Sequence, residues 1–199
     1  MATGSKAKRG RPRDAATHQS ILDAANGILE ELGCRSFSIE AVAARAGVSK
    51  AAIYRRWPSK GALLVDLYML GLEASGAGRV EEGRSAEAEF TEYFGLTITL
   101  LDEPIWAQTL SGLMAECQGN PEIASLMRER IVEPRREVGR RIIARGIRTG
   151  ELAADTDVEL LLDFVFGAIW YRLLLGHAPL DAAFLDAVRR QVFGRTDAS

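Results

Sequence analysis

A short run of basic and aromatic side chains has the chemistry to bind a polyanion, and it comprises Lys50, Tyr54, Arg55, Arg56 and Lys60. Lys and Arg cations neutralise phosphates, and a tyrosine hydroxyl can donate a hydrogen bond to a phosphate oxygen. Lys50 and Tyr54 are four residues apart, so a helix presents them on one side together with Arg55. The spacing therefore predicts a helix whose exposed face contacts a nucleic acid.

Two short helices joined by a tight turn are expected to position these side chains. Ser38 suits the N-cap of the first helix, Gly47 ends that helix, and Ser49 suits the N-cap of the second. Ala51 and Ala52 are small enough to let the start of the second helix approach base edges. Helix, turn and helix together predict a helix-turn-helix. The competing interpretation is an amphipathic helical hairpin whose basic side chains are simply solvated.

Charge is distributed unevenly along the 199 residues, although the net charge is only -2. Residues 1–65 hold eleven Lys and Arg against five Asp and Glu, a formal charge of +6, whereas residues 66–199 carry -8. This asymmetry indicates a polyanion-binding N-terminal part. Residues 1–13 contain five bases and no acid, and we expect a disordered basic arm. The arm either aids solubility or contacts DNA through Arg9, Arg11 and Arg13.

Four stretches carry a resemblance to a known family: Phe37-Ser38-Ile39, Ala43-Ala44-Arg45-Ala46-Gly47-Val48-Ser49-Lys50, Ile53-Tyr54 and Trp57-Pro58-Ser59-Lys60. Through them, residues 14–65 resemble the tetracycline-repressor-type (TetR) family of bacterial transcriptional regulators. The resemblance implies a three-helix DNA-binding domain, a helical ligand-binding domain, a homodimer and a palindromic operator in double-stranded DNA.

The same resemblance implies roles for individual residues. Phosphate contacts fall on Ser38, Tyr54 and Lys60. Lys50 and Ala51 take base-facing positions, and Arg55 reaches either backbone or base. Arg56 stands where the family often has an aromatic residue or His, and an Arg there could add a phosphate contact.

The fold class predicted for the whole chain is all-α, with a helix-turn-helix domain followed by a helical ligand-binding and dimerisation domain. We expect the basic arm at 1–13, the DNA-binding domain at 14–60, and the second domain at 61–199, with a connecting helix at about 60–75. A long helix from Glu122 to about Arg148 should kink or break at Pro134.

The last two helices are expected to pair with their symmetry mates as a four-helix bundle, because residues 155–175 are apolar nearly all round. The predicted dimer residues are Leu161, Phe164, Val165, Ala168, Phe184, Leu185, Val188 and Val192. The alternative is that these helices only complete a monomeric core.

Aromatic and flexible apolar residues from several helices could line an effector pocket, and they are Phe90, Phe94, Trp106, Leu110, Met114, Met127, Phe166 and Trp170. Such a lining suits a small hydrophobic or aromatic molecule. The alternative for each residue is an ordinary place in the core.

Other kinds of chemistry lack the residues they need. The chain has two histidines, His18 and His177, which are too isolated for a catalytic or metal site, so we expect no enzyme activity, no metal and no cofactor. Cys34 and Cys117 have neither metal-ligand nor redox spacing. The longest charge-free run is 104–115, short of the about 20 residues of a membrane span. We therefore expect a cytoplasmic protein without a membrane partner.

The sequence favours a homodimeric repressor that a small effector releases from its operator. An architectural DNA-binding protein that responds to no small molecule is the alternative. A helical enzyme with an accessory DNA-binding domain is a third class, and no catalytic set supports it.

Overall fold

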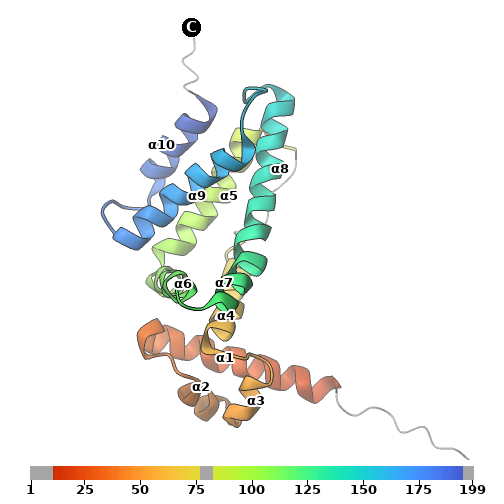
Figure 1. Cartoon of the computed structure of the whole chain (residues 1–199), viewed down its shortest axis with the longest axis vertical. Coiled ribbons are helices and arrows are strands. Elements are labelled where there is room, and N and C mark those ends of the chain that lie inside the picture. The colour runs from red at the N-terminus through yellow and green to blue at the C-terminus, as the bar shows by residue number, and fades with distance from the viewer. Residues whose placement is uncertain (1–10, 77–82, 195–199) are drawn as a thin grey trace, which may run out of the picture. The chain divides into compact units, whose positions relative to one another are not determined.

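The computed structural model of the protein describes residues 11–76 and 83–194 (Figure 1). Over these ranges the chain forms helices and no strand, which confirms the all-α prediction. It divides into two compact units between Leu63 and Leu64. Residues 1–10 of the predicted arm lie outside the described residues, and the first helix begins at Arg11.

The first unit contains three helices and the start of a fourth. They are α1 (Arg11–Ser36), α2 (Ile39–Ala46), α3 (Lys50–Tyr54) and α4 (Lys60–Ala74). Its core is made of buried aliphatic side chains from three helices. They are Ile21, Ala25 and Ile28 at helical spacing in α1, Val42 in α2 and Ile53 in α3. α1 leaves the helical conformation at Gly33, where φ is 72°.

Side-chain caps define the ends of α2 and α3 as predicted. The Ser38 hydroxyl accepts a hydrogen bond from Ala41 N at 3.2 Å, and the Ser49 hydroxyl accepts one from Ala52 N at 3.2 Å. Between them, Gly47 adopts a left-handed conformation with φ 65°, which an L side chain rarely takes. The tight turn therefore fixes where α3 begins.

The second unit packs the remaining helices around a second core. They are α5 (Ala86–Asp102), α6 (Pro104–Cys117), α7 (Pro121–Met127), the π turn η1 (Arg128–Val132), α8 (Glu133–Thr149), α9 (Val158–Leu175) and α10 (Ala182–Phe193). α5 packs against α6, α8 and α10, and α9 packs against α6 and α8. None of the helices formed by residues 11–76 and 83–194 is both long enough and apolar enough to cross a membrane.

Pro134 interrupts the predicted long helix without ending its course. In the π turn the Glu133 N–H bonds to the carbonyl of Arg128, five residues back. Because proline has no N–H and its ring clashes with the carbonyl four residues earlier, the ladder widens just before it. The helix resumes as α8 with Pro134 in its first turn, where a missing N–H costs little.

Candidate DNA interface and effector cavity

The exposed side of α3 carries the side chains that the sequence assigned to DNA. Lys50, Ala51 and Arg55 are exposed, and Tyr54 is 47% exposed. On the opposite side Ile53 is fully buried. The structure therefore presents four of the predicted DNA contacts together on one surface of α3. The buried Ile53 side chain fixes the opposite side of the helix in the core.

The ammonium of Lys50 forms an ion pair with the Glu40 carboxylate, at a distance of 2.9 Å. The hydrogen bond from Lys50 lowers the pKa of Glu40, and the same bond raises the pKa of Lys50. Both side chains are more than half exposed, so the pair can open readily. For Lys50 to reach a base edge, it must exchange this carboxylate for the DNA.

The other predicted contacts have partners within the first unit. Arg56 donates from Nη1 to the Ala52 carbonyl at 3.0 Å, which turns its guanidinium back along α3. Lys60 is the first residue of α4 and lies 5.7 Å from the centroid of the Phe37 ring. The Ser38 hydroxyl is already an acceptor in its cap, and it keeps a proton to donate.

The three arginines of the predicted arm cannot be placed. Arg9 lies outside the described residues, and Arg11 and Arg13 belong to α1, where the structure describes the backbone of these positions but not their side chains. Their contact with DNA stays a prediction.

An apolar cavity of about 370 Å³ lies within the second unit. It is lined by residues of α4, α5, α6, η1, α8 and α9: Tyr68, Thr97, Leu101, Leu110, Ile131, Val132, Arg135, Arg136, Asp163, Phe166, Gly167, Ile169 and Trp170. Its size falls in the range of about 300–1,000 Å³ that small-molecule sites occupy. The cavity is therefore the candidate effector site.

Only some of the predicted pocket residues line this cavity. Leu110, Phe166 and Trp170 line the cavity. The others are not among its lining residues, and they are Phe90, Phe94, Trp106, Met114 and Met127. Phe90 and Phe94 are fully packed, with ring centroids 4.5 Å apart, and Phe90 also meets Phe193 of α10 at 5.4 Å. These two rings join helices together and leave no room for a ligand.

The polar side chains of the cavity wall were absent from the predicted pocket, and they are Tyr68, Thr97, Arg135, Arg136 and Asp163. Arg135 donates a hydrogen bond to the Thr97 hydroxyl, which in turn donates to the Tyr93 carbonyl at 3.0 Å. Burial raises the pKa of Tyr68 to about 12, although the positive charge of Arg135 opposes the shift. Tyr68 is therefore a neutral phenol at physiological pH. A signal for Arg135 existed in the sequence, since it follows the helix-disrupting Pro134.

A second arginine, Arg136, is occupied by carboxylates at one edge of the cavity. Its guanidinium pairs with Glu159 and Asp163 of α9. Arg140 also pairs with Glu159, and the hydrogen bonds from Arg140 and then Arg136 lower the pKa of Glu159 to about 2. These ion pairs join α8 to α9 beside the cavity.

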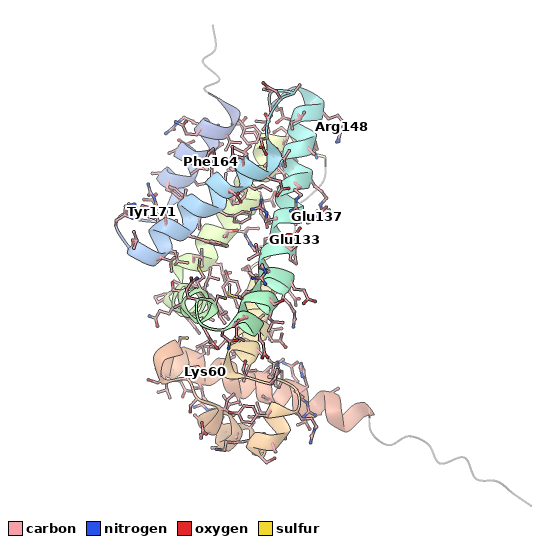
Figure 2. The ribbon with its side chains drawn as sticks, in the orientation of Figure 1. Lys60, Glu133, Glu137, Arg148, Phe164 and Tyr171 are labelled. Carbon is pink, nitrogen blue, oxygen red and sulfur yellow. The ribbon has the colours of Figure 1, made fainter. Side chains whose placement is uncertain are left out.

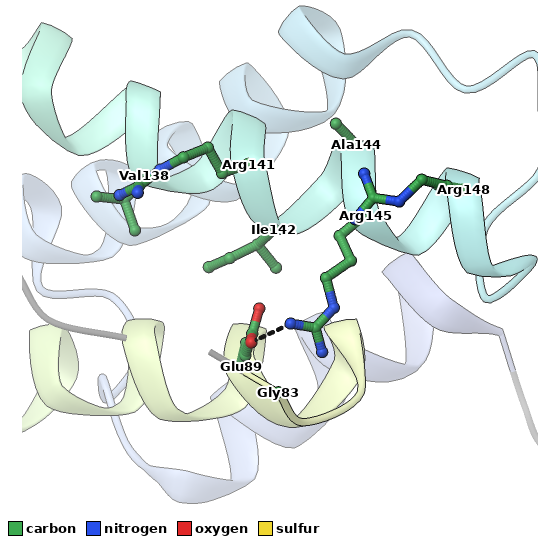
Figure 3. Close-up of a pocket in the computed structure, with 8 residues that line it drawn as sticks. All are labelled: Gly83, Glu89, Val138, Arg141, Ile142, Ala144, Arg145 and Arg148. Atoms are coloured by element: carbon green, nitrogen blue, oxygen red, sulfur yellow. Dashed lines mark hydrogen bonds and ion pairs between the residues drawn. The ribbon is translucent and has the colours of Figure 1, made fainter. Parts of the chain in front are cut away.

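A larger groove, of about 650 Å³, runs between α5 and α8 (Figure 3). It is lined by Gly83, Glu89, Val138, Arg141, Ile142, Ala144, Arg145 and Arg148. Glu89 is 4% exposed and pairs with Arg145 across the groove. The lining contains no aromatic ring, so the groove suits an apolar or aromatic effector less well than the cavity does.

The outer face of α9 exposes large apolar side chains. Phe164 is 65% exposed and Tyr171 is 59% exposed, and Figure 2 marks both on α9. Leu160, Leu174 and Leu175 extend the same exposure along the helix. Of the predicted dimer residues, Val165 and Phe184 are buried within the unit, so they do not belong to this face. Leu161, Ala168, Leu185, Val188 and Val192 are half-buried.

Comparison with known proteins covers most of the chain. Residues 21–67 match the family model for bacterial regulatory proteins of the tetR family, and residues 80–192 match that for the tetracyclin repressor-like C-terminal domain. The uncharacterized HTH-type transcriptional regulator YdeS of Bacillus subtilis is 33% identical over 173 residues, covering 85% of this chain and 84% of YdeS.

Two further relatives agree. The DNA-binding transcriptional repressor TetR of Mycobacteroides abscessus is 29% identical over 182 residues, covering 89% of this chain and 90% of that protein. The solved structure of the TetR family transcription regulator SCO0332 superposes with a TM-score of 0.73 at 27% identity, covering 88% of this chain and 95% of that one.

Proposed function

Because the chain belongs to the TetR family of DNA-binding transcriptional regulators, we propose that it acts as a homodimeric repressor of transcription. A small apolar or aromatic effector releases it from a palindromic operator. The relatives in the comparison are transcriptional regulators and not enzymes, which supports a regulatory role without catalysis.

The observation that carries this proposal is the exposed face of α3. Lys50, Tyr54 and Arg55 project from a helix whose start is capped by Ser49 and whose inner side is anchored by Ile53. A rigid helix with a basic and aromatic face is the form in which helix-turn-helix proteins enter the major groove. In this proposal Lys50 and Ala51 face bases, Arg55 faces base or backbone, and Ser38, Tyr54, Arg56 and Lys60 face phosphates.

The apolar face of α9 supports the homodimer. An exposed apolar patch on a monomer marks an interaction surface, and a symmetric pair covers the same patch on both copies. A dimer has two α3 helices, and these enter successive major grooves about 34–36 Å apart. The operator is then a palindrome, because the two halves of a symmetric dimer read the same sequence.

The cavity supports the response to an effector. α4 begins at Lys60, one of the proposed phosphate contacts, and contains the cavity residue Tyr68 eight residues later. A ligand that binds one arrangement of the protein better than another shifts the population toward it. Release of DNA follows if the favoured arrangement no longer matches the operator spacing.

Selection of bound sequences from random double-stranded DNA tests the proposal. We expect an inverted repeat with half-sites about one helical turn apart, and binding that weakens when an effector occupies the cavity. A selected pool without an inverted repeat would contradict the homodimeric repressor. An architectural DNA-binding protein would instead bind with little sequence preference and keep its DNA in the presence of every small molecule tested.

A further inference from the structure

The groove between α5 and α8 concentrates positive charge (Figure 3). Among the described residues, its lining contains three arginines and one glutamate, a formal charge of +2. Residues 66–199 carry -8, so the groove is a positive concavity in an otherwise acidic part of the chain. Concave walls of low dielectric focus the field of such charges and raise the local concentration of counter-ions. The groove therefore attracts anions that the rest of this part repels.

The three arginines lie on one side of α8 because of their spacing. Arg141, Arg145 and Arg148 are four and three residues apart, which places them on one face of the helix. With a rise of about 1.5 Å per residue, the first and the last are about 10 Å apart along the helix axis. α8 is packed closely against α5, since a Cβ added at Gly146 would lie 3.2 Å from the Ala86 Cβ. Close packing therefore holds in place the backbone that carries the arginines.

Arg145, the middle arginine, is balanced by a carboxylate of the protein. Its guanidinium pairs across the groove with Glu89, which is 4% exposed. A buried carboxylate that loses its partner is strongly destabilising, so Arg145 keeps this contact when a ligand binds. The pair cancels the negative charge of Glu89, which would otherwise repel an anion from the groove.

Arg141 and Arg148 have no such carboxylate. Both are exposed, and neither forms an ion pair within residues 11–76 and 83–194. Arg140, beside Arg141 in the chain, is paired with three carboxylates, those of Glu133, Glu137 and Glu159. Figure 3 shows Arg141 toward one end of the groove and Arg148 toward the other. The groove thus presents two cations at separate positions, with a neutralised pair between them.

We propose that this groove is a second ligand site, which binds a small organic molecule with two or more phosphate groups. Arg141 and Arg148 bind the phosphates, because a planar guanidinium forms two parallel hydrogen bonds with a phosphate. Val138, Ile142 and Ala144, which also line the groove, contact the organic part of the ligand. Among the described residues, the groove and the effector cavity share no lining residue, so the inference goes beyond the proposed function.

The chemical class follows from the size and charge of the groove. Its volume of about 650 Å³ falls within the range of about 300–1,000 Å³ that small-molecule sites occupy. An exposed ion pair contributes little by itself, so a ligand with a single charge gains little here. A ligand whose phosphates reach both arginines gains from the two pairs at once. A DNA duplex also has phosphates, but it needs a more extended surface, and the acidic character of residues 66–199 opposes its approach.

Isothermal titration calorimetry on the full-length protein, without DNA and in the presence of EDTA, tests this site. The probes are adenosine, AMP, ADP and ATP, which share one organic part and differ in the number of phosphates. We expect each phosphate added to AMP to tighten binding at least about 3-fold, so that ATP binds about 10-fold more tightly than AMP. Adenosine should bind weakest, and high salt should remove most of the differences. If ATP binds no more tightly than AMP, or if none of the four binds, the proposal is overturned.

Paired variants locate the site, because the DNA-binding side chains of the first unit are also basic. Arg141→Gln combined with Arg148→Gln should weaken ATP binding at least about 10-fold. Replacing both arginines with Lys keeps the charge and should retain part of the affinity. The matched control is Lys50→Gln combined with Arg55→Gln, which removes two exposed cations from α3 and leaves the groove intact. An equal loss of ATP affinity in the two glutamine double variants would overturn the proposal.

The phosphate series in the unmodified protein needs no variant, so a variant that fails to fold does not leave the inference open. Fluorescence anisotropy with the selected operator separates this site from DNA binding. The Arg141→Gln, Arg148→Gln protein should bind DNA with unchanged affinity and salt slope. A salt slope reduced by about 2 would show that these arginines contact DNA phosphates, and it would overturn the small-molecule site. If the phosphate series holds and no operator is found, the repressor is wrong and the groove stands.

Discussion

Replacing Phe164 with Ala should dissociate the proposed dimer while leaving each protomer folded. Phe164 is 65% exposed on the outer face of α9, so its ring contributes little to the core of its own unit. In a symmetric pair this ring is buried twice, once from each copy. Loss of the ring therefore acts on association and not on folding.

The size of the effect follows from the exposed area. A Phe side chain covers about 150–250 Å². With 65% exposed, roughly 130 Å² remains for a partner to bury, which corresponds to about 3 kcal/mol per protomer at about 25 cal/mol per Å². Alanine keeps the Cβ atom, and association also orders the ring, so we take half of this value for each protomer. The two protomers together then lose about 3 kcal/mol of association free energy. The dimer dissociation constant should rise about 100-fold.

Sedimentation velocity over a dilution series measures this constant directly. Leu32→Ala is the matched control, because Leu32 is a large apolar side chain that is 54% exposed and belongs to α1 of the first unit. Circular dichroism should show the same helix content for both variants. A dissociation constant for Phe164→Ala within about 3-fold of the Leu32→Ala value would refute the assignment of this face to the dimer.

Three further changes test the proposed DNA contacts and the cap at the start of α5. Glu40→Gln should tighten operator binding, because it frees Lys50 from its ion pair and removes a carboxylate beside the DNA; weaker binding in an anisotropy titration would contradict this. The double change Tyr54→Ala and Lys60→Ala should weaken binding to all DNA sequences and reduce the salt slope by about 1, and an unaltered slope would argue against both phosphate contacts. Glu151→Gln should lower the free energy of unfolding by about 1 kcal/mol, because this carboxylate accepts two backbone N–H groups, each at 3.0 Å, at the start of α5. Burial raises the pKa of Glu151, but these N–H groups outweigh it and hold the pKa below the ordinary 4.5. The stabilisation by ionised Glu151 is therefore present above pH 4.5 and is lost as the pH falls through the lowered pKa of this carboxyl. In acid, urea unfolding should therefore give the same free energy for the unmodified protein and for Glu151→Gln.

The helix-turn-helix could be read from the sequence because its signals are local. Ser38 and Ser49 cap helices that begin within one residue of them, and Gly47 takes the positive φ that the turn requires. A cap needs a hydroxyl and a glycine turn needs a missing Cβ, and both are visible in the residue type itself. The faces of α3 follow from its period alone.

The cavity could not be read in this way, because it depends on which helices meet. Hydrophobicity indicates that Phe90 and Phe94 leave water, but it does not indicate that they pack against one another or that Phe90 packs against Phe193 of α10. Nothing in the sequence around Tyr68 or Thr97 distinguishes them from other residues of an amphipathic helix. They become wall residues of a cavity only because α4 and α5 converge with the π turn that Pro134 imposes.

α9 shows where helical periodicity alone fails and why that matters for function. Its residues are apolar nearly all round, so the sequence could not separate the buried Val165 from the exposed Phe164. In the structure neighbouring positions point to different places: Asp163 and Trp170 line the cavity, and Phe164 and Tyr171 lie on the outer face. A ligand and a second protomer would thus touch the same helix about 100° apart. If the dimer forms through the outer face, any shift of α9 that a ligand favours is also a shift of the dimer contact. Effector affinity and dimer geometry are then linked thermodynamically, and each must change when the other is altered.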